Sequence, residues 1–260
     1  MELNRKKIDK EIVAQRFKAA IDTYDNNAVA QKHIQHELLR IITAYCPEIK
    51  FKSALDIGCG TCGMTKLLDN EFGIKYWTLN DLNEECYDHG SFRTNTRSKV
   101  RFIAGDAEEI NYGGTYDLIV CSSTMQWFHD LNAFFLKIKN HLKKDGYLLL
   151  STFGPDNLKE IKTLTGHGLH YPKGDDLKAM LEKHFELCYF QEEHYNMEFT
   201  SPREVLEHLK HTGVNAVSAT NNFWTPCKLR CFEKDYRDLF GNAEGKVSLT
   251  YNPIYILARL

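Results

Sequence analysis

The chain has 260 residues, of which 43% are hydrophobic and 26% are charged, and its formal net charge is −2. This length suits one globular domain with a small lid or insertion, and the near-neutral charge provides no overall basic field for nucleic acid. No stretch approaches the roughly 18 apolar residues of a membrane span, and the N-terminal MELNRKKIDKEIVAQ lacks the apolar run of a signal peptide. Most of the eight cysteines lie beside apolar residues, which indicates buried thiols in a reducing cytoplasm. We therefore expect a cytoplasmic protein without a membrane or nucleic-acid partner.

The chain begins with two predicted helices and then alternates between strands and helices. Apolar residues at helical spacing predict helices over residues 4–24 and 28–45, the second ending before Pro47. Predicted strands and helices alternate from residue 53 to 153. This alternation predicts an α/β fold, in which helices cover both faces of a parallel sheet. The strands are expected at Ser53–Ile57, Lys75–Asn80, Val100–Ala104, Tyr116–Ser122 and Tyr147–Phe153. The intervening helices are expected at Met64–Phe72, Asn83–His89 and Leu131–Leu142, the last stopping at a turn over residues 143–146.

The pattern after Phe153 is less regular and contains the candidates for a lid. We expect the chain to form one domain, with N-terminal helices at 1–46, a core at 47–153, a lid or substrate region at 154–245 and a final strand at 246–260. Ser201, Pro202 and Glu204 are typical of a helix start. The final strand is expected to be antiparallel at or near an edge, with Pro253 as a local irregularity. The remaining helices are expected at Pro155–Thr165, Lys173–His184, Ser201–His211 and Lys228–Phe240, and a further strand at Phe185–Glu193.

The segment LDIGCGTCG, residues 55–63, satisfies two patterns at once. Gly58, Gly60 and Gly63 match the G-x-G-x-x-G dinucleotide fingerprint, whereas the two cysteines match C-x-x-C. The segment follows a strand and opens a helix, which is where an open α/β sheet binds its ligand. Asp81 ends the next strand, 21 residues after Gly60, and suits a ribose hydroxyl pair. This much fits NAD and S-adenosylmethionine equally well.

Asp56 separates these two ligands because it lies two residues before Gly58. A pyrophosphate would meet a fixed negative charge there, whereas a carboxylate favours the ammonium and sulfonium of S-adenosylmethionine. The third strand then ends in Gly105-Asp106-Ala107, where the aspartate can accept a hydrogen bond from an adenine amino group. These strand ends predict an S-adenosylmethionine site. The alternative is a tight turn with unrelated surface aspartates.

The D-x-G-x-G turn, the strand-end aspartate and the G-D-A segment together resemble the class I S-adenosylmethionine-dependent methyltransferases, over about residues 53–153. The resemblance implies a Rossmann-like sheet flanked by helices, and it places Gly58 and Gly60 against the methionine part of the cofactor. It also implies that Asp81 binds the ribose and that Asp106 and Ala107 lie near the adenine. The full set of cofactor-binding residues expected in this way is Asp56, Gly58, Cys59, Gly60, Asp81, Leu82, Asp106, Ala107 and Ser122.

A metal site is not expected. Structural zinc usually takes two cysteine pairs, and the chain has no second C-x-x-C. His208 and His211 have the spacing of metal ligands, but no acidic residues accompany them as further ligands. Redox use of Cys59 and Cys62 stays an alternative, since thioredoxin-like motifs also open a helix.

Five segments outside the glycine turn carry a sharper resemblance, to the malonyl-carrier-protein O-methyltransferases of biotin synthesis. The N-terminal RFKAAIDTYDNNAVAQ is similar to that family's R-F-x-x-A-A-x-x-Y-D-x-x-A-x-x-Q segment. STMQWFHDL resembles its L-Q-W loop after the fourth strand, with Met125 in place of the common leucine. The other three segments are STFGPDNL at 151–158, SPREVLEHLKHTGVNA at 201–216 and LTYNP at 249–253.

The resemblance implies a reaction and a partner. Methyl transfer to the free carboxylate of a malonyl thioester would yield a methyl ester and S-adenosylhomocysteine, the first step towards a pimeloyl precursor of biotin. The substrate would be an acidic acyl carrier protein bearing malonyl-phosphopantetheine, with malonyl-CoA as the alternative. A carboxylate needs no general base, so the enzyme must align it with the methyl group and exclude water.

Residues of the resembling segments are the candidates for this chemistry. Tyr24, Gln126 and Trp127 are the catalytic candidates, and Tyr24 is expected to touch both cofactor and substrate. The alternatives are an amphipathic helix-end residue for Tyr24 and a core residue for Trp127. The substrate-binding candidates are Arg203, Lys210, His211 and Tyr251. Two basic clusters are candidates for docking a carrier protein: Lys137, Lys139, Lys143 and Lys144, and Arg203, Lys210, Lys228, Arg230 and Lys234.

Two other functions remain open. One is a different methyltransferase of the same fold, acting on a free dicarboxylic acid or a quinone precursor. The other is a non-catalytic S-adenosylmethionine-binding module that acts through a protein partner. The segment LKHTGVNA argues against the first, and a substrate cavity lined by Tyr24 and Trp127 would argue against the second.

Overall fold

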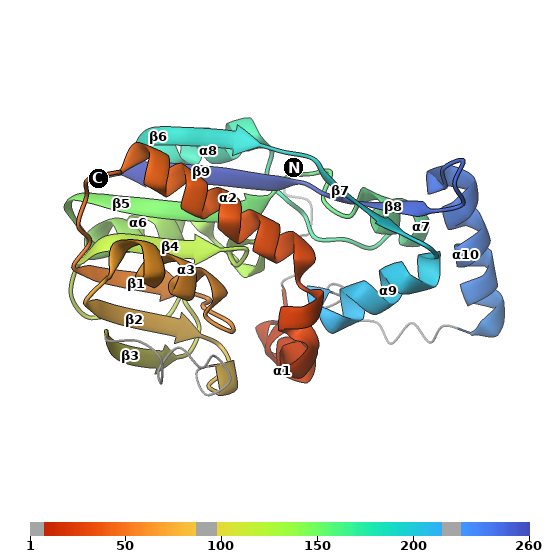
Figure 1. Ribbon diagram of the computed structural model, residues 1–260, viewed down its shortest axis with the longest axis horizontal. Coiled ribbons are helices and arrows are strands. Elements are labelled where there is room, and N and C mark those ends of the chain that lie inside the picture. The colour runs from red at the N-terminus through yellow and green to blue at the C-terminus, as the bar shows by residue number, and fades with distance from the viewer. Residues whose placement is uncertain (1–7, 87–97, 215–224) are drawn as a thin grey trace. The chain divides into compact units, whose positions relative to one another are not determined.

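The structure is a computed structural model that describes residues 8–86, 98–214 and 225–260 (Figure 1). The chain folds into two compact units, each assembled from segments that are far apart in the sequence. The core unit combines Val29–Thr152 with Lys173–Glu192 and Ile254–Leu260. The helical unit combines Met1–Ala28 with Phe153–Pro172 and Glu193–Pro253.

A seven-stranded sheet forms the centre of the core unit. Its strand order is β3-β2-β1-β4-β5-β9-β6, and β1 pairs in parallel with both β2 and β4. The chain therefore leaves β1 towards one edge of the sheet and returns later to its other side. The carboxyl ends of β1 and β4 flank this reversal, which is where open α/β sheets bind ligands. The strands are β1 Ser53–Ile57, β2 Tyr76–Asp81, β3 Lys99–Ala104, β4 Tyr116–Ser122, β5 Leu142–Phe153, β6 Glu186–Glu192 and β9 Pro253–Arg259.

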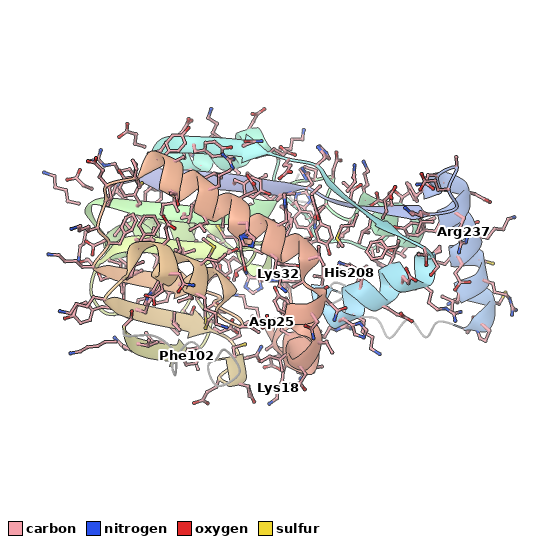
Figure 2. The ribbon with its side chains drawn as sticks, in the orientation of Figure 1. Lys18, Asp25, Lys32, Phe102, His208 and Arg237 are labelled. Atoms are coloured by element: carbon pink, nitrogen blue, oxygen red, sulfur yellow. The ribbon has the colours of Figure 1, made fainter. Side chains whose placement is uncertain are left out.

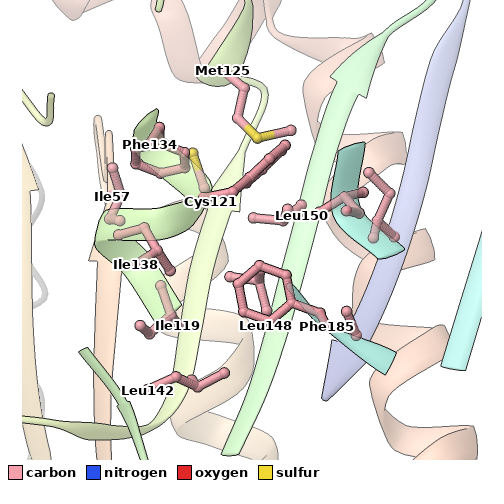
Figure 3. Close-up of a cluster of buried hydrophobic side chains, with 14 of the residues drawn as sticks. Ile57, Ile119, Cys121, Met125, Phe134, Ile138, Leu142, Leu148, Leu150 and Phe185 are labelled. Carbon is pink, nitrogen blue, oxygen red and sulfur yellow. The ribbon is translucent and has the colours of Figure 1, made fainter. Parts of the chain in front are cut away.

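Helices cover both faces of this sheet. In Figure 1, α2 and α3 lie together in front of the sheet, and they pack against each other. On the opposite face, alternate strand residues such as Leu55, Ile119 and Leu148 form one buried cluster with residues of α6 and α8 (Figure 3). Because both faces are covered, the central strands are continuous apolar runs, as the sequence indicated. These helices are α2 Val29–Tyr45, α3 Gly63–Phe72, α6 Leu131–His141 and α8 Gly174–Glu182, and a 3₁₀ turn, η1, spans Met125–Trp127.

Strand β8 connects the elements of the helical unit. It pairs with β7 in an antiparallel two-stranded sheet. The buried carboxylate of Glu160 on α7 accepts hydrogen bonds from the Thr250 amide at 3.0 Å and the Thr250 hydroxyl at 2.6 Å. The phenol of Tyr236 on α10 donates to the Ser248 carbonyl at 2.7 Å. The elements are α1 Lys10–Asn27, α7 Lys159–Thr165, β7 Tyr195–Phe199, α9 Pro202–His211, α10 Pro226–Phe240 and β8 Val247–Tyr251.

The predicted final strand at 246–260 is wrong as a single element, because the chain forms β8 and β9 in two different sheets. The break falls at Asn252, which is fully buried. Its carbonyl accepts from the Gly154 amide at 2.7 Å, and its side-chain oxygen accepts from the Asp156 amide at 3.1 Å. The chain therefore changes sheets where Pro253 had predicted a local irregularity. The expected antiparallel strand near an edge is confirmed for β9, which pairs with the edge strand β6.

Other element boundaries differ modestly from prediction. The expected turn over residues 143–146 lies within β5, where the β4–β5 register shifts and Asp145 has a φ of 64°. The helix start at Ser201 is confirmed, since its hydroxyl accepts from the Glu204 amide. Strand β7 was not predicted. The helix predicted at Asn83–His89, and the start of the first helix, lie partly outside the described residues. Within the described ranges, no helix has the length and apolar character needed to cross a membrane.

The packing of α6 against the sheet can be tested by its effect on stability. Phe134 is 1% exposed and its ring packs at a tilt against those of Phe128 and Phe135, whereas Leu136 on the same helix is 54% exposed. We expect Phe134→Ala to lower the free energy of unfolding by about 3–5 kcal/mol because it leaves a cavity. The control Leu136→Ala should change it by less than about 0.5 kcal/mol. Urea denaturation measures both, and similar losses for the two variants would contradict this packing.

Candidate active site

The glycine turn after β1 is fixed to the end of β2 by backbone hydrogen bonds. The amides of Gly58 and Cys59 both donate to the Asn80 carbonyl, at 2.8 and 2.9 Å. The Gly60 amide donates to the Asp81 carboxylate at 3.0 Å. Cys62 then adopts a left-handed conformation, φ 62°, and caps α3 without a side-chain hydrogen bond. The turn that was predicted from its glycines is thus held by two consecutive residues of the neighbouring strand.

The three glycines of the motif are required for different reasons. At Gly58, φ is +69° and an added Cβ would lie 2.3 Å from the Thr124 hydroxyl oxygen. At Gly60, φ is +50° and nothing lies within 4 Å of an added Cβ. At Gly63, an added Cβ would lie 2.7 Å from the side-chain oxygen of Gln35 on α2. The close neighbour of Gly63 is therefore α2. Only Gly60 leaves open space for a ligand.

Asp56 is buried directly beneath this turn. Its side chain is 1% exposed, and its carboxylate accepts a hydrogen bond from the Thr65 hydroxyl of α3. Burial raises the pKa of Asp56 to about 7, and the nearby charge of Asp81 adds to the increase. A positive charge bound at the turn would favour the ionised form of Asp56, and a phosphate would oppose it.

The ends of β2 and β3 hold the other predicted cofactor residues. The two carboxylate oxygens of Asp81 accept from the Gly60 and Asn83 amides, and burial raises the pKa of Asp81. Asp106 follows β3 and accepts from the Glu108 amide at 2.9 Å. The side chain of Asn80 donates to the Ile103 and Gly105 carbonyls, at 2.9 and 3.0 Å. Leu82 and Ala107 follow Asp81 and Asp106 directly, so these four residues lie at adjacent strand ends.

Asn80 is a site residue that the sequence analysis missed. Its carbonyl holds the glycine turn and its amide holds the end of β3, so it connects three strand ends. The only signal in the sequence was its place before Asp81. Asn80 is 1% exposed, and a side chain buried to this extent needs hydrogen-bond partners for its polar groups.

The loop after β4 lies against the glycine turn. Ser122 ends the strand, and Ser123 has a φ of 53°, with its amide donating to the Ser151 hydroxyl at 2.9 Å. The Thr124 hydroxyl donates to the Ser122 carbonyl, and its side chain occupies the space over Gly58. A serine in the left-handed region is held by its surroundings, and such strain is frequent at ligand-binding sites.

Gln126 and Trp127 belong to η1 in this loop. The Gln126 amide nitrogen donates to the Ser123 carbonyl at 2.7 Å. Its side-chain oxygen is buried and has no hydrogen-bond partner in the described residues. Trp127 is 6% exposed, so most of its ring is buried, in line with the core alternative, and contact with a substrate stays a prediction.

The helical unit holds the other predicted site residues. Tyr24 lies near the end of α1, and Lys210 and His211 end α9, which contacts α1. The Thr23 hydroxyl donates to the His211 carbonyl at 3.4 Å. Arg203 is paired with Glu233 of α10 at 3.2 Å, so its charge is already compensated. The structure brings Tyr24, Lys210 and His211 to neighbouring helices but gives Arg203 a surface ion pair.

Tyr251 is buried in this unit and bonded to a histidine. Its hydroxyl lies 2.8 Å from Nε2 of His208, which is labelled on α9 in Figure 2. Burial, with a contribution from His211, lowers the pKa of His208 to about 4, so this histidine is neutral at physiological pH. Burial also raises the pKa of Tyr251, and the phenols of Tyr24 and Tyr171 add to the increase. A substrate contact for Tyr251 stays a prediction.

Comparison with known proteins decides the family. Residues 30–219 match a family model described as a methyltransferase domain. A malonyl-(acyl-carrier protein) O-methyltransferase of Porphyromonas gingivalis is 41% identical over 258 residues, covering 99% of this chain and 98% of that protein. A protein of the same name from Haemophilus influenzae is 36% identical, covering 97% of this chain and 95% of its own length. The chain belongs to the malonyl-(acyl-carrier protein) O-methyltransferases. It is thus an S-adenosylmethionine-dependent methyltransferase.

Solved structures confirm the class I methyltransferase fold. The N-methyltransferase NodS of Bradyrhizobium japonicum, in complex with S-adenosylhomocysteine, matches with a TM-score of 0.51 and 12% identity, covering 91% of this chain and 97% of NodS. A phosphoethanolamine N-methyltransferase of Haemonchus contortus, in complex with S-adenosylmethionine, matches with a TM-score of 0.53 and 18% identity. That match covers 86% of this chain and 52% of the other.

The residues at the turn fit the cofactor of this family. Gly60 leaves space over the backbone, and the Asp81 carboxylate lies at the adjacent strand end. The buried Asp56 disfavours a pyrophosphate and favours a cationic ligand. Cys59 and Cys62 are free buried thiols, and the Cys62 hydrogen bond and burial together raise the pKa of Cys59. Among the described residues, no three histidine, cysteine or acidic side chains are grouped to hold a metal ion.

The glycines of the turn give a direct stability test. We expect Gly58→Ala to lower the free energy of unfolding by roughly 2–4 kcal/mol, because its methyl group would overlap Thr124 in a left-handed backbone. Gly60→Ala should cost only about 1 kcal/mol, from the backbone conformation alone. Urea denaturation of the ligand-free protein measures both. Equal losses would show that Thr124 does not occupy the space over Gly58.

The buried carboxylate gives a pH-dependent test. Because burial raises the pKa of Asp56 from 3.8 to about 7, the folded state binds this proton more tightly than the unfolded state. The contribution of the protonated Asp56 to the free energy of unfolding is fully present below about pH 4 and is lost as the pH rises through 7. Asp56→Asn keeps the acceptor for Thr65 and should remove this loss, leaving the variant roughly 2–4 kcal/mol more stable than the wild type at pH 8. Parallel curves for the two proteins between pH 4 and 8 would contradict a raised pKa.

Proposed function

We propose that this protein transfers a methyl group from S-adenosylmethionine to the free carboxylate of a malonyl thioester carried by an acyl carrier protein. The observation that carries the proposal is the extent of the family match. The relative from P. gingivalis covers 99% of this chain, so the match includes the helical unit as well as the sheet. Specificity among methyltransferases lies outside the shared sheet, so a match over the helical unit supports a shared acceptor.

The reaction requires positioning more than acid–base chemistry. S-adenosylmethionine, when bound, supplies a methyl group made electrophilic by its sulfonium. A malonyl carboxylate oxygen forms a bond to the methyl carbon as the bond from that carbon to sulfur breaks, and sulfur keeps the electron pair. No proton moves, so no general base is needed. The protein must hold the carboxylate roughly 3 Å from the methyl carbon and exclude water.

Tyr24 and Lys210 are the proposed groups that hold the carboxylate. A phenol hydroxyl donates one hydrogen bond, and an ammonium adds charge attraction without removing the second oxygen from the reaction. Both lie in the helical unit, where α1 and α9 contact each other. His211 and Tyr251 belong to the same unit, and we propose them as secondary contacts. Trp127 of η1 is proposed to exclude water.

The acidic carrier protein is proposed to dock on the exposed basic residues of α9 and α10. Lys228, Arg230 and Lys234 are exposed on α10 and carry charges for this purpose. The other predicted cluster is less suitable, because Lys143 is bonded to Asp117 at 2.9 Å and Lys137 to the Ala107 carbonyl at 2.9 Å. The resulting methyl ester would hide a charge and begin pimeloyl synthesis for biotin in the cytoplasm. Malonyl-CoA, which lacks the carrier surface, should be the poorer substrate.

Methyl transfer to a substrate panel tests the proposed acceptor. The protein is incubated with S-adenosylmethionine labelled in its methyl group and, separately, with malonyl-carrier protein, malonyl-CoA, free malonate, acetyl-carrier protein and a quinone precursor. We expect label in the malonyl thioesters only, released as methanol by alkali because it is an ester. Label in free malonate or the quinone precursor, but not in the thioesters, would contradict the proposal.

Substitutions of the carboxylate-binding groups test their role. We expect Tyr24→Phe and Lys210→Ala each to lower kcat by about tenfold or more, the range expected for a hydrogen bond to a charged group. The affinity for S-adenosylhomocysteine should change much less. Lys159→Ala, which removes an exposed lysine of α7 in the same unit, is the matched control and should leave kcat unchanged. Unchanged kcat in Tyr24→Phe or Lys210→Ala removes that residue from the site.

A further inference from the structure

We propose that Gln31 binds the ammonium group of the methionyl part of S-adenosylmethionine, with Gln126 as a second acceptor. The inference rests on the cofactor of the proposed function and assigns a part of it to residues of the core unit. It also gives Gln126 a role towards the cofactor rather than the malonyl carboxylate.

The first observation is a buried acceptor without a partner on α2. Gln31 is 5% exposed, and its side-chain oxygen has no hydrogen-bond partner among the described residues. A buried amide oxygen without a partner costs about 1–3 kcal/mol, so native proteins rarely keep one without a use. A ligand that donates a hydrogen bond to this oxygen would remove the cost.

The second observation places Gln31 on the face of α2 that contacts the start of α3. Gln35 lies one helical turn further along α2, and its amide occupies the space over Gly63, the first residue of α3. Side chains four residues apart lie on the same face of a helix, so Gln31 faces the same side as Gln35. In Figure 1, α2 begins at the carboxyl end of the sheet, and Gln31 belongs to the first turn of this helix, before Gln35.

The third observation is a pair of unpaired oxygens in the loop after β4. The side-chain oxygens of Ser123 and Gln126 are buried and have no partner among the described residues. The Gln126 nitrogen is already used, because it donates to the Ser123 carbonyl at 2.7 Å. The next residue after Ser123, Thr124, packs over Gly58. Of the four buried side-chain atoms without a partner in the described residues, three therefore belong to elements that contact the glycine turn.

The chemistry of these oxygens selects the ligand group. An ionised carboxylate has no hydrogen to donate, so neither the malonyl carboxylate nor the methionyl carboxylate can satisfy an amide oxygen. An ammonium has three N–H donors and suits several acceptors at once. The charge of the buried Asp56 at the base of the turn also favours a cation. The ribose hydroxyls are expected at Asp81 and the adenine at Asp106, which leaves the ammonium for Gln31 and Gln126.

Equilibrium binding to three related ligands tests this assignment. S-adenosylhomocysteine has the ammonium and the carboxylate, its decarboxylated analogue has only the ammonium, and 5′-methylthioadenosine has neither. Gln31→Met keeps the shape of the side chain and removes the acceptor. By calorimetry, we expect the variant to bind the first two ligands about tenfold or more weakly and 5′-methylthioadenosine with unchanged affinity. Gln126→Met should show the same selectivity.

A control variant, and the results that would contradict the proposal, are judged by comparing the affinities for these ligands. Gln35→Met removes an amide from the same helix and should leave the ratio of the affinities for S-adenosylhomocysteine and 5′-methylthioadenosine as in the wild type. A loss in Gln31→Met for S-adenosylhomocysteine alone would assign Gln31 to the carboxylate and overturn the proposal. Equal affinities of variant and wild type for all three ligands would also overturn it.

The wild-type protein alone provides a test that does not depend on folding of a variant. It should bind the decarboxylated analogue at least tenfold more tightly than 5′-methylthioadenosine. Equal affinities for these two would overturn the role of the ammonium while leaving the proposed methyl transfer intact. Failure to bind S-adenosylhomocysteine at all would instead overturn the cofactor, and this inference with it.

Discussion

Two amides of the glycine turn, those of Gly58 and Cys59, share one acceptor, the carbonyl oxygen of Asn80 at the end of β2. The positions of the other groups at the carboxyl ends of β1, β2 and β3 follow from this interaction. With the turn fixed to β2, the Asp81 carboxylate meets the Gly60 amide, and the Asn80 side chain holds the end of β3. Rigid strand ends place charged groups with the accuracy that a loop alone would not provide. The buried Asp56 then sets the sign of charge that the turn accepts.

The two units serve the proposed chemistry in different ways. The core unit presents backbone and carboxylate groups at the ends of parallel strands, where the fold itself determines their positions. In the helical unit, Tyr24 and Lys210 are carried by α1 and α9, which contact each other, and α9 is bonded to β8 through His208. The Glu160–Thr250 and His208–Tyr251 bonds are buried, so they stabilise this unit only while both partners are present. Substitutions in the helical unit are therefore expected to weaken binding of the methyl acceptor more than binding of the cofactor.

The sequence predicted the core unit well because β1, β4 and β5 contain continuous apolar runs and because glycine or aspartate marks the ends of β1, β2 and β3. The start of β1 at Ser53 was confirmed, and so was the helix cap at Ser201 in the helical unit. Features that depend on distant partners were missed. The sheet change at Asn252 depends on Gly154 and Asp156, and β7 is a short, half-exposed strand whose partner lies about 50 residues later. The need for Gly63 likewise comes from a side chain of α2, which no local pattern shows.

The central claim is that the glycine turn accepts a cationic adenosyl ligand rather than a dinucleotide phosphate. Isothermal titration of the purified protein with S-adenosylmethionine and with NAD, at the same concentrations and at pH 8, tests it most directly. We expect S-adenosylmethionine to bind with one site per chain and NAD to give no measurable heat or competition, because the ionised Asp56 opposes a pyrophosphate. Binding of NAD at this site, displaced by S-adenosylmethionine or tighter than it, would contradict the account.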